Sequence, residues 1–303
     1  MRIHSALIPP LRGSSIDIHP NARWQQNGVT VAGGNGRGNG INQLSNPYGL
    51  YVDDDQTLYV ADRSNHRIVE WKSGATSGQV VAGGNGQGSG AHQLSNPYDV
   101  IVDKERDSLI ICDRSNARVV RWPRRNGTSG ETIISNIDCM ALTMDENGSL
   151  YVADVGKADV GIRNGLTVAG GNGQGNGINQ LYNPWGLYVD DDQTLYVADP
   201  SNYRIVEWKS GATSGQVVAG GNGEGSGAHQ LSNPYDVIVD KERDSLIICD
   251  RSNRRVARWP RRNGTSGETI ISNIDCMGLT MDENGSLYVT DYGKAEVRRY
   301  RRG

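Results

Sequence analysis

The feature that most constrains this chain is an internal duplication. Residues 33–160 recur as residues 170–297 with only twelve differences. Each half contains three shorter units. The unit "NPYGLYVDDDQTLYVADRSNHRIVEWKSG" at 46–74 is followed by "NPYDVIVDKERDSLIICDRSNARVVRWPR" at 96–124 and by a looser echo at 136–160. Six such units indicate a solenoid or a propeller, because a unit this short buries its apolar face only against its neighbours.

Each unit has the pattern of four short strands. In the first unit "GLYVD" and "TLYVAD" are mostly apolar, "RIVEWK" alternates, and "GQVVAG" closes the unit. Turn-forming clusters of Asp, Asn, Ser and Gly separate these segments, and no segment has helical periodicity of useful length. The sequence therefore predicts an all-β fold, a six-bladed β-propeller of four-stranded antiparallel blades.

The two ends of the chain complement each other. The last unit stops after its third strand, at "AEVRRYRRG", whereas "NGVTVAGGNG" at 27–36 matches the fourth strand of other units. We expect the strand at Val29–Ala32 to complete the last blade and so to remove an exposed sheet edge. The predicted organisation is an irregular N-terminal extension over residues 1–26 and a propeller over residues 27–303, with three blades in each half.

The unit at 46–74 resembles the NHL repeat, whose motif is Pro-x-Gly, then Leu-Tyr-Val-x-Asp, then Asn-His-Arg. The matching residues are Pro47, Gly49, Asp53, Leu58, Tyr59, Val60, Asp62, Asn65, His66 and Arg67. The unit at 183–211 fits with Tyr203 in place of the histidine, and the other four fit more weakly. The resemblance implies a binding platform for proteins, RNA or extracellular ligands. A minority of related propellers are enzymes, such as the peptidyl-amidoglycolate lyases, and the chain lacks the clustered histidines that those lyases need.

One acidic position recurs at the end of every second strand, just before a tight turn. We expect its carboxylate to accept backbone N–H groups of that turn, and Arg67 or Arg118 to pair with it, which is a structural role. The residues are Asp62, Asp113, Asp154, Asp199, Asp250 and Asp291.

Four glycine-rich segments, at 33–48, 83–98, 170–185 and 220–235, invite comparison with phosphate-binding loops. A phosphate loop needs Gly-Lys-Ser/Thr and a following helix, and neither is present. We therefore interpret the segments as joints from the outer strand of one blade to the inner strand of the next.

No residue pattern specifies a metal or a catalytic group. His92 and His229 occupy equivalent joint positions, but a zinc site needs three or four ligands, and the counterpart of His66 is Tyr203. The runs Asp53–Asp55 and Asp190–Asp192 are typical of solvated turns. We expect no cofactor, no bound metal and no enzymatic activity.

The four cysteines repeat between the halves. Cys112 with Cys139, and Cys249 with Cys276, lie at strand ends of adjacent blades, so two disulfides are sterically possible; buried free thiols are the alternative. Disulfides would imply an oxidising compartment. Four glycosylation sequons are compatible with secretion, at Asn126, Asn147, Asn263 and Asn284.

Composition adds three expectations. A formal net charge of −3 shows no basic excess, so we do not expect a nucleic-acid partner. No stretch reaches the roughly 18 apolar residues of a membrane span. The N-terminus is a poor signal peptide, which leaves open whether Met1 is the natural start. We expect an extracellular or secreted protein, with a cytoplasmic one as the alternative.

The twelve differences between the halves are not evenly spread. Eight fall in the joints or in the turns between second and third strands, which share one face of a propeller, here called the top face. The turns of the opposite face are identical between the halves, so tolerance of exposed loops does not explain the bias. We predict partner contacts on the top face at Tyr48, Arg63, His66, Tyr182, Trp185, Tyr203, Arg254 and Tyr292.

The functional hypothesis is a non-catalytic binding module whose top face recognises a protein or glycan. The alternative is a structural protein that self-assembles into an oligomer or filament, with the N-terminal extension docked on a neighbouring copy. The family resemblance leaves two further alternatives, a propeller lyase or hydrolase and an RNA-binding domain.

Overall fold

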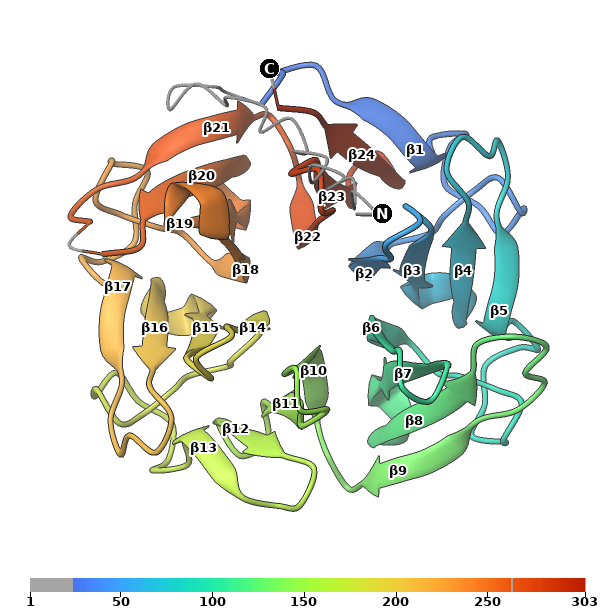
Figure 1. Cartoon of the computed structure of the whole chain (residues 1–303), viewed down its shortest axis with the longest axis horizontal. Coiled ribbons are helices and arrows are strands. Elements are labelled where there is room, and N and C mark those ends of the chain that lie inside the picture. The colour runs from blue at the N-terminus through green and yellow to red at the C-terminus, as the bar shows by residue number, and fades with distance from the viewer. Residues whose placement is uncertain (1–23, 263, 303) are drawn as a thin grey trace, which may run out of the picture.

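The computed structural model describes residues 24–262 and 264–302. They form six four-stranded antiparallel sheets, arranged as blades around a common axis (Figure 1). In five blades the chain runs outward from the strand nearest the axis, and the sixth blade contains both ends of the described chain. The prediction of an all-β six-bladed propeller is confirmed.

The strands have the following bounds. Blade 1 contains β2 (Pro47–Val52), β3 (Leu58–Asp62), β4 (Arg67–Trp71) and β5 (Gln79–Gly83), and blade 2 contains β6 (Pro97–Asp103), β7 (Ser108–Asp113), β8 (Arg118–Pro123) and β9 (Glu131–Ser135). Blade 3 contains β10 (Cys139–Met144), β11 (Leu150–Asp154), β12 (Asp159–Ile162) and β13 (Thr167–Gly170), and blade 4 contains β14 (Leu187–Val189), β15 (Leu195–Asp199), β16 (Arg204–Trp208) and β17 (Gln216–Gly220). Blade 5 contains β18 (Pro234–Asp240), β19 (Ser245–Asp250), β20 (Arg255–Pro260) and β21 (Glu268–Ser272), and blade 6 contains β22 (Cys276–Met281), β23 (Leu287–Asp291), β24 (Glu296–Tyr300) and β1 (Val29–Gly33).

The N-terminal strand closes the ring as expected. β1 pairs antiparallel with β24, so the outer edge of blade 6 is supplied by the opposite end of the chain. Trp24, inside the predicted extension, is buried and bridges to Arg302. The remainder of that extension, residues 1–23, lies outside the described residues.

Apolar side chains fill the interfaces between neighbouring blades, with one cluster at each of the six interfaces. Between blades 1 and 2, for example, Tyr59 and Ile68 pack with Val100 and Trp122. The second strand β3 is buried at every position, because it lies between two strands of its sheet and between two blades. The closed ring therefore gives every blade a packed neighbour on both faces.

The glycine-rich segments connect outer strands to inner strands, and each places one leucine in a blade interface. Leu44, Leu94, Leu181 and Leu231 are fully buried. In the segment at 83–98, carbonyl oxygens of Ser89, Gly90 and Gln93 accept hydrogen bonds from the guanidinium of Arg118. The segment thus presents carbonyls inward to a cation, the reverse of a phosphate loop, which presents N–H groups to an anion.

The recurrent aspartate anchors these joints. Asp113 is fully buried, pairs with Arg118 at 2.7 Å, and accepts the backbone N–H of Ser95 in the joint. The predicted ion pair is present, but the predicted backbone partner was wrong for four blades. In blades 1, 2, 4 and 5 the donor belongs to the joint, as with Ser45 and Asp62, because the joint folds back over the strand end. Only in blades 3 and 6 does the turn itself donate, as Lys157 does to Asp154.

The two remaining joints are short and carry the disulfides. Cys112 bonds to Cys139 and Cys249 bonds to Cys276, linking the second strand of one blade to the inner strand of the next. The choice between disulfides and free thiols is therefore decided in favour of disulfides. Blades 2 and 3, and blades 5 and 6, are joined covalently where the long leucine-bearing joint is missing.

Candidate binding surface on the top face

The top face carries the joints and four one-turn 3-10 helices. These are η1 (Arg63–Asn65), η2 (Arg114–Asn116), η3 (Pro200–Asn202) and η5 (Arg251–Asn253). A fifth 3-10 helix, η4 (Lys241–Arg243), follows the inner strand β18 and lies on the opposite face. Each top-face helix ends at a residue in the left-handed conformation, with φ between 49° and 54°. Non-glycine residues adopt this conformation at a cost, so the turns hold their side chains in defined positions.

Aromatic rings from several blades meet across the axis on this face. Tyr48 lies in β2, the inner strand of blade 1, and Trp185 precedes β14, the inner strand of blade 4, which lies opposite in the ring. Their ring centroids are 6.3 Å apart. Tyr48 also contacts Tyr98 at 4.7 Å and Tyr292 at 6.0 Å. Trp185 stacks on Tyr235 at 3.8 Å. The five rings form one cluster at the axis.

Guanidinium groups cover the edges of this cluster. Arg63 lies 5.1 Å from the ring centroid of Tyr48 and 5.0 Å from that of Tyr98. The other three are Arg114 over Tyr98, Arg251 over Tyr235 and Tyr292, and Arg37 over Tyr292. These distances are those of cation–π contacts. We call the five rings and four arginines the aromatic–arginine cluster.

The positive charge of this cluster is only partly balanced. Arg114 pairs with Asp138 at 2.7 Å and Arg251 with Asp275 at 3.0 Å. Arg63 has ring contacts but neither an ion pair nor a hydrogen bond among the described residues, and its Nε is buried without an acceptor. Burial raises the pKa of Tyr48 to about 12, against the opposing effect of Arg63, so its phenol is neutral and supplies no charge. Arg63 therefore has no counter-ion among the described residues.

Four of the eight predicted contact residues come together here: Tyr48, Arg63, Trp185 and Tyr292. The other four lie further from the axis. Tyr182 is 41% exposed on its joint, and His66 accepts the backbone N–H of Asn96 at Nδ1. Tyr203 and Arg254 occupy the left-handed ends of their turns.

Sequence reasoning missed Arg37, Tyr98, Arg114, Tyr235 and Arg251. All but Arg37 are identical in the two halves, so a comparison of the halves had no means of selecting those four. A usable signal did exist. Tyr98 and Tyr235 occupy the place of Tyr48 in "NPY", and Arg114 and Arg251 occupy the place of Arg63 in "RSN".

Three further predictions concern other surfaces and sites. Asn126, Asn147 and Asn284 are exposed in turns, whereas Asn263 lies outside the described residues. Within residues 24–262 and 264–302, no three His, Cys, Asp or Glu side chains gather as metal ligands would. No helix in the same described part is long and apolar enough to cross a membrane.

The blades and their joints define a six-bladed β-propeller. Residues 44–71 and 181–208 match the family model of the NHL repeat, and the two matched segments lie in blades 1 and 4 of the propeller. These are the two units that carry the fullest motif in the sequence.

Solved structures with this fold include both enzymes and binding proteins. Streptogramin B lyase matches at 10% identity over 86% of this chain and 94% of its own, with a TM-score of 0.55. Aldose sugar dehydrogenase from Streptomyces coelicolor, in its PQQ-bound form, matches at 15% identity over 93% and 99%, with a TM-score of 0.65. An auxiliary nutrient binding protein from Bacteroides thetaiotaomicron matches at 15% identity over 90% and 75%, with a TM-score of 0.63. A search of curated protein sequences gave no match. Identities this low establish the fold alone.

Proposed function

We propose that this protein is a non-catalytic binding module whose top face recognises an anionic group of a protein or glycan partner. The observation that carries the proposal is the aromatic–arginine cluster, in which Arg63 stands beside two tyrosine rings without a counter-ion. Aromatic and arginine side chains supply much of the binding energy at protein interfaces. A carboxylate or sulfate of the partner would pair with Arg63 while the rings pack against its apolar part.

The partner meets the protein in an oxidising, extracellular compartment under this proposal. The two disulfides support that location, because disulfides persist mainly outside the reducing cytosol. The self-assembly alternative depends on the N-terminal extension, most of which lies outside the described residues.

Substitution of the central side chains is expected to weaken partner binding. The partner would be selected on arrays of acidic and neutral glycans and on an immobilised peptide library, and its Kd measured by biolayer interferometry. Arg63→Ala, Tyr48→Ala and Trp185→Ala should each raise that Kd by about 10- to 30-fold, as expected for central contact residues.

Arg125→Ala is the matched control, because Arg125 is a highly exposed arginine on the opposite face. It should leave the Kd unchanged, and the melting temperatures of all variants should stay near that of the wild type. Unaltered binding by Arg63→Ala and Trp185→Ala, in variants that fold normally, would contradict the assignment of this face.

A further inference from the structure

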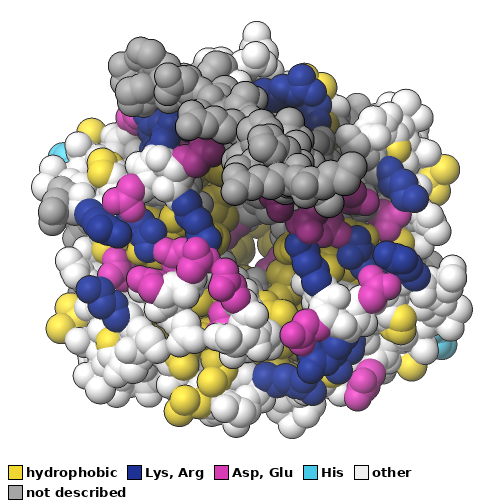
Figure 2. All heavy atoms as spheres, viewed as in Figure 1, with side chains coloured by type: hydrophobic (Ala, Val, Ile, Leu, Met, Phe, Trp, Pro, Cys, Tyr) yellow, Lys and Arg dark blue, Asp and Glu magenta, His cyan; other side chains and the backbone are white. Residues whose placement is uncertain are grey.

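The inner strands enclose a cavity of about 560 Å³ that opens on the face opposite the aromatic–arginine cluster. Its mouth is formed by the turns after the inner strands of blades 5 and 6 and by Arg302. Figure 2 views this face, which is hollowed at its centre, with apolar side chains inside the hollow and charged side chains around it. The cations at the mouth already have partners: Lys241 pairs with Asp191, and Arg302 with Asp240.

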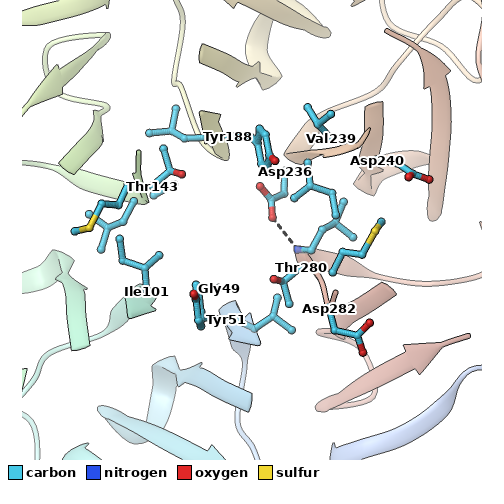
Figure 3. A pocket seen from close by; sticks show the side chains of 18 of the residues that line it. Gly49, Tyr51, Ile101, Thr143, Tyr188, Asp236, Val239, Asp240, Thr280 and Asp282 are labelled. Atoms are coloured by element: carbon cyan, nitrogen blue, oxygen red, sulfur yellow. Dashed lines mark hydrogen bonds between the residues drawn. The ribbon is translucent and has the colours of Figure 1, made fainter. Parts of the chain in front are cut away.

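The wall of the cavity combines apolar and polar groups, and its lining residues repeat between the two halves of the chain. One side chain per blade forms its middle layer, namely Tyr51, Ile101, Thr143, Tyr188, Ile238 and Thr280 (Figure 3). Met144 and Met281 also line it. The volume of the cavity is within the range of small-molecule sites in proteins.

Two carboxylates line the cavity, Asp99 from β6 of blade 2 and Asp236 from β18 of blade 5, and these blades lie opposite each other in the ring (Figure 1). Their hydrogen bonds come from backbone N–H groups: Asp99 accepts from Val100 and Leu142, and Asp236 from Val237 and Leu279 (Figure 3). Neither carboxylate has an ion pair with any described residue. Burial raises the pKa of Asp99 to about 7 and that of Asp236 to about 8, and in Asp236 the charge of Asp99 adds to the effect. Two carboxyl groups thus line a cavity in which no cation of the described residues pairs with them.

The fold itself does not require these carboxylates. The equivalent position of the inner strand is glycine or alanine in the other four blades, at Gly49, Ala141, Gly186 and Gly278. Glycines on neighbouring inner strands also leave space for the two carboxylates. A Cβ on Gly49 would lie 2.0 Å from Oδ1 of Asp99, and a Cβ on Gly186 would lie 2.1 Å from Oδ1 of Asp236. The hydrogen bonds to Leu142 and Leu279 hold the carboxylates in place, but a neutral acceptor would serve that purpose as well.

We propose that this cavity binds an organic cation, with an ammonium group beside Asp99 and Asp236 and an apolar body against the tyrosine and isoleucine wall. Ammonium–carboxylate hydrogen bonds are charge-assisted, and aromatic rings accept a nearby cation. The cavity opens on the opposite face from the proposed partner surface, and its carboxylates directly follow Tyr98 and Tyr235 of the aromatic–arginine cluster in the chain. The proposal does not depend on the partner surface.

The affinity for such a cation should rise with pH. Between about pH 6 and pH 9 both carboxyls become ionised while an alkylammonium stays protonated. Burial also raises the pKa of Tyr51 and Tyr188, so these phenols stay neutral in that range. The charged groups at the mouth are Asp240, Lys241, Glu242, Asp282, Glu283 and Arg302.

The test compares tyramine with 4-ethylphenol, which has nearly the same shape and no charge. Isothermal titration calorimetry at about pH 9 should give tyramine at least a roughly tenfold lower Kd. The double variant Asp99→Asn, Asp236→Asn should lose that preference. Asp54→Asn, Glu105→Gln removes two exposed carboxylates on the same face and should change nothing. Equal binding of the two probes, or an unchanged preference in the Asp99 and Asp236 variant, would overturn the proposal.

A second measurement uses only the wild-type protein and so does not depend on the folding of a variant. With ¹³C-methyl methionine labelling, tyramine should shift the signals of Met144 and Met281, which line the cavity, more than those of Met140 and Met277. No binding at about 10 mM tyramine, or shifts confined to other methyl groups, would also overturn it.

Discussion

Asp199→Ala is expected to lower the free energy of unfolding by about 3–5 kcal/mol, the usual cost of removing one partner of a buried ion pair. Asp199 is fully buried and pairs with Arg204, whose side chain is only 5% exposed. It also accepts hydrogen bonds from Asn202 and from the backbone N–H of Tyr182. The alanine variant would leave the buried charge of Arg204 without a counter-ion, and Nε of Arg204 and the backbone N–H of Tyr182 without an acceptor. Urea unfolding followed by tryptophan fluorescence measures the loss.

Asp191→Ala is the matched control for that experiment. Asp191 pairs with Lys241 at 2.5 Å, but its side chain is 59% exposed, so its loss should cost about 1 kcal/mol or less. Asp199→Asn keeps the shape and removes the charge, and should fall between the wild type and Asp199→Ala. If Asp199→Ala were no more destabilising than Asp191→Ala, the joints would not depend on this ion pair.

Removal of one disulfide, by Cys112→Ser with Cys139→Ser, should lower the free energy of unfolding by about 3.5 kcal/mol. That figure is the entropic free energy that the unfolded chain gains when a link across a sequence separation of 27 residues is lost. The second disulfide spans the same separation, so Cys249→Ser with Cys276→Ser should have an equal effect. The two pairs lie on opposite sides of the ring, and the fourfold variant should therefore lose close to the sum.

The same urea titration with a reducing agent provides the control for the serine side chains. Reduced wild-type protein should match the fourfold variant in its midpoint. A loss within about 1 kcal/mol for either pair would mean that the short joints are held by packing rather than by the covalent link.

The sequence alone was enough to determine the fold, because the evidence for it is local and repeated. The alternation in "RIVEWK", the turn residues between strands and the recurrence of the unit each follow from residues close together in the chain. The match of residues 27–36 to a fourth strand was likewise sufficient to predict that β1 closes blade 6. A repeat that cannot bury its apolar face alone leaves few architectures open.

The candidate sites were only partly accessible to the same reasoning. Variation between the halves selected Tyr48, Trp185, Arg63 and Tyr292, but it passed over Tyr98, Tyr235 and the arginines that do not vary. It also selected His66 and Tyr182, which lie away from the axis. Which side chains meet depends on opposite blades approaching each other across the ring, a distance that no spacing in the sequence encodes.

The same limit applies to charge. Asp99 and Asp236 are two unremarkable aspartates in the sequence, in segments that read simply as strands. Only the tertiary structure brings them to one cavity from opposite blades, with no ion pair to any described residue. The sequence by itself determined the blade, its strands and their number, since those depend on neighbouring residues. The tertiary structure determined which residues face the axis and which carboxylates lack an ion pair. Both properties arise only when distant blades enclose one space.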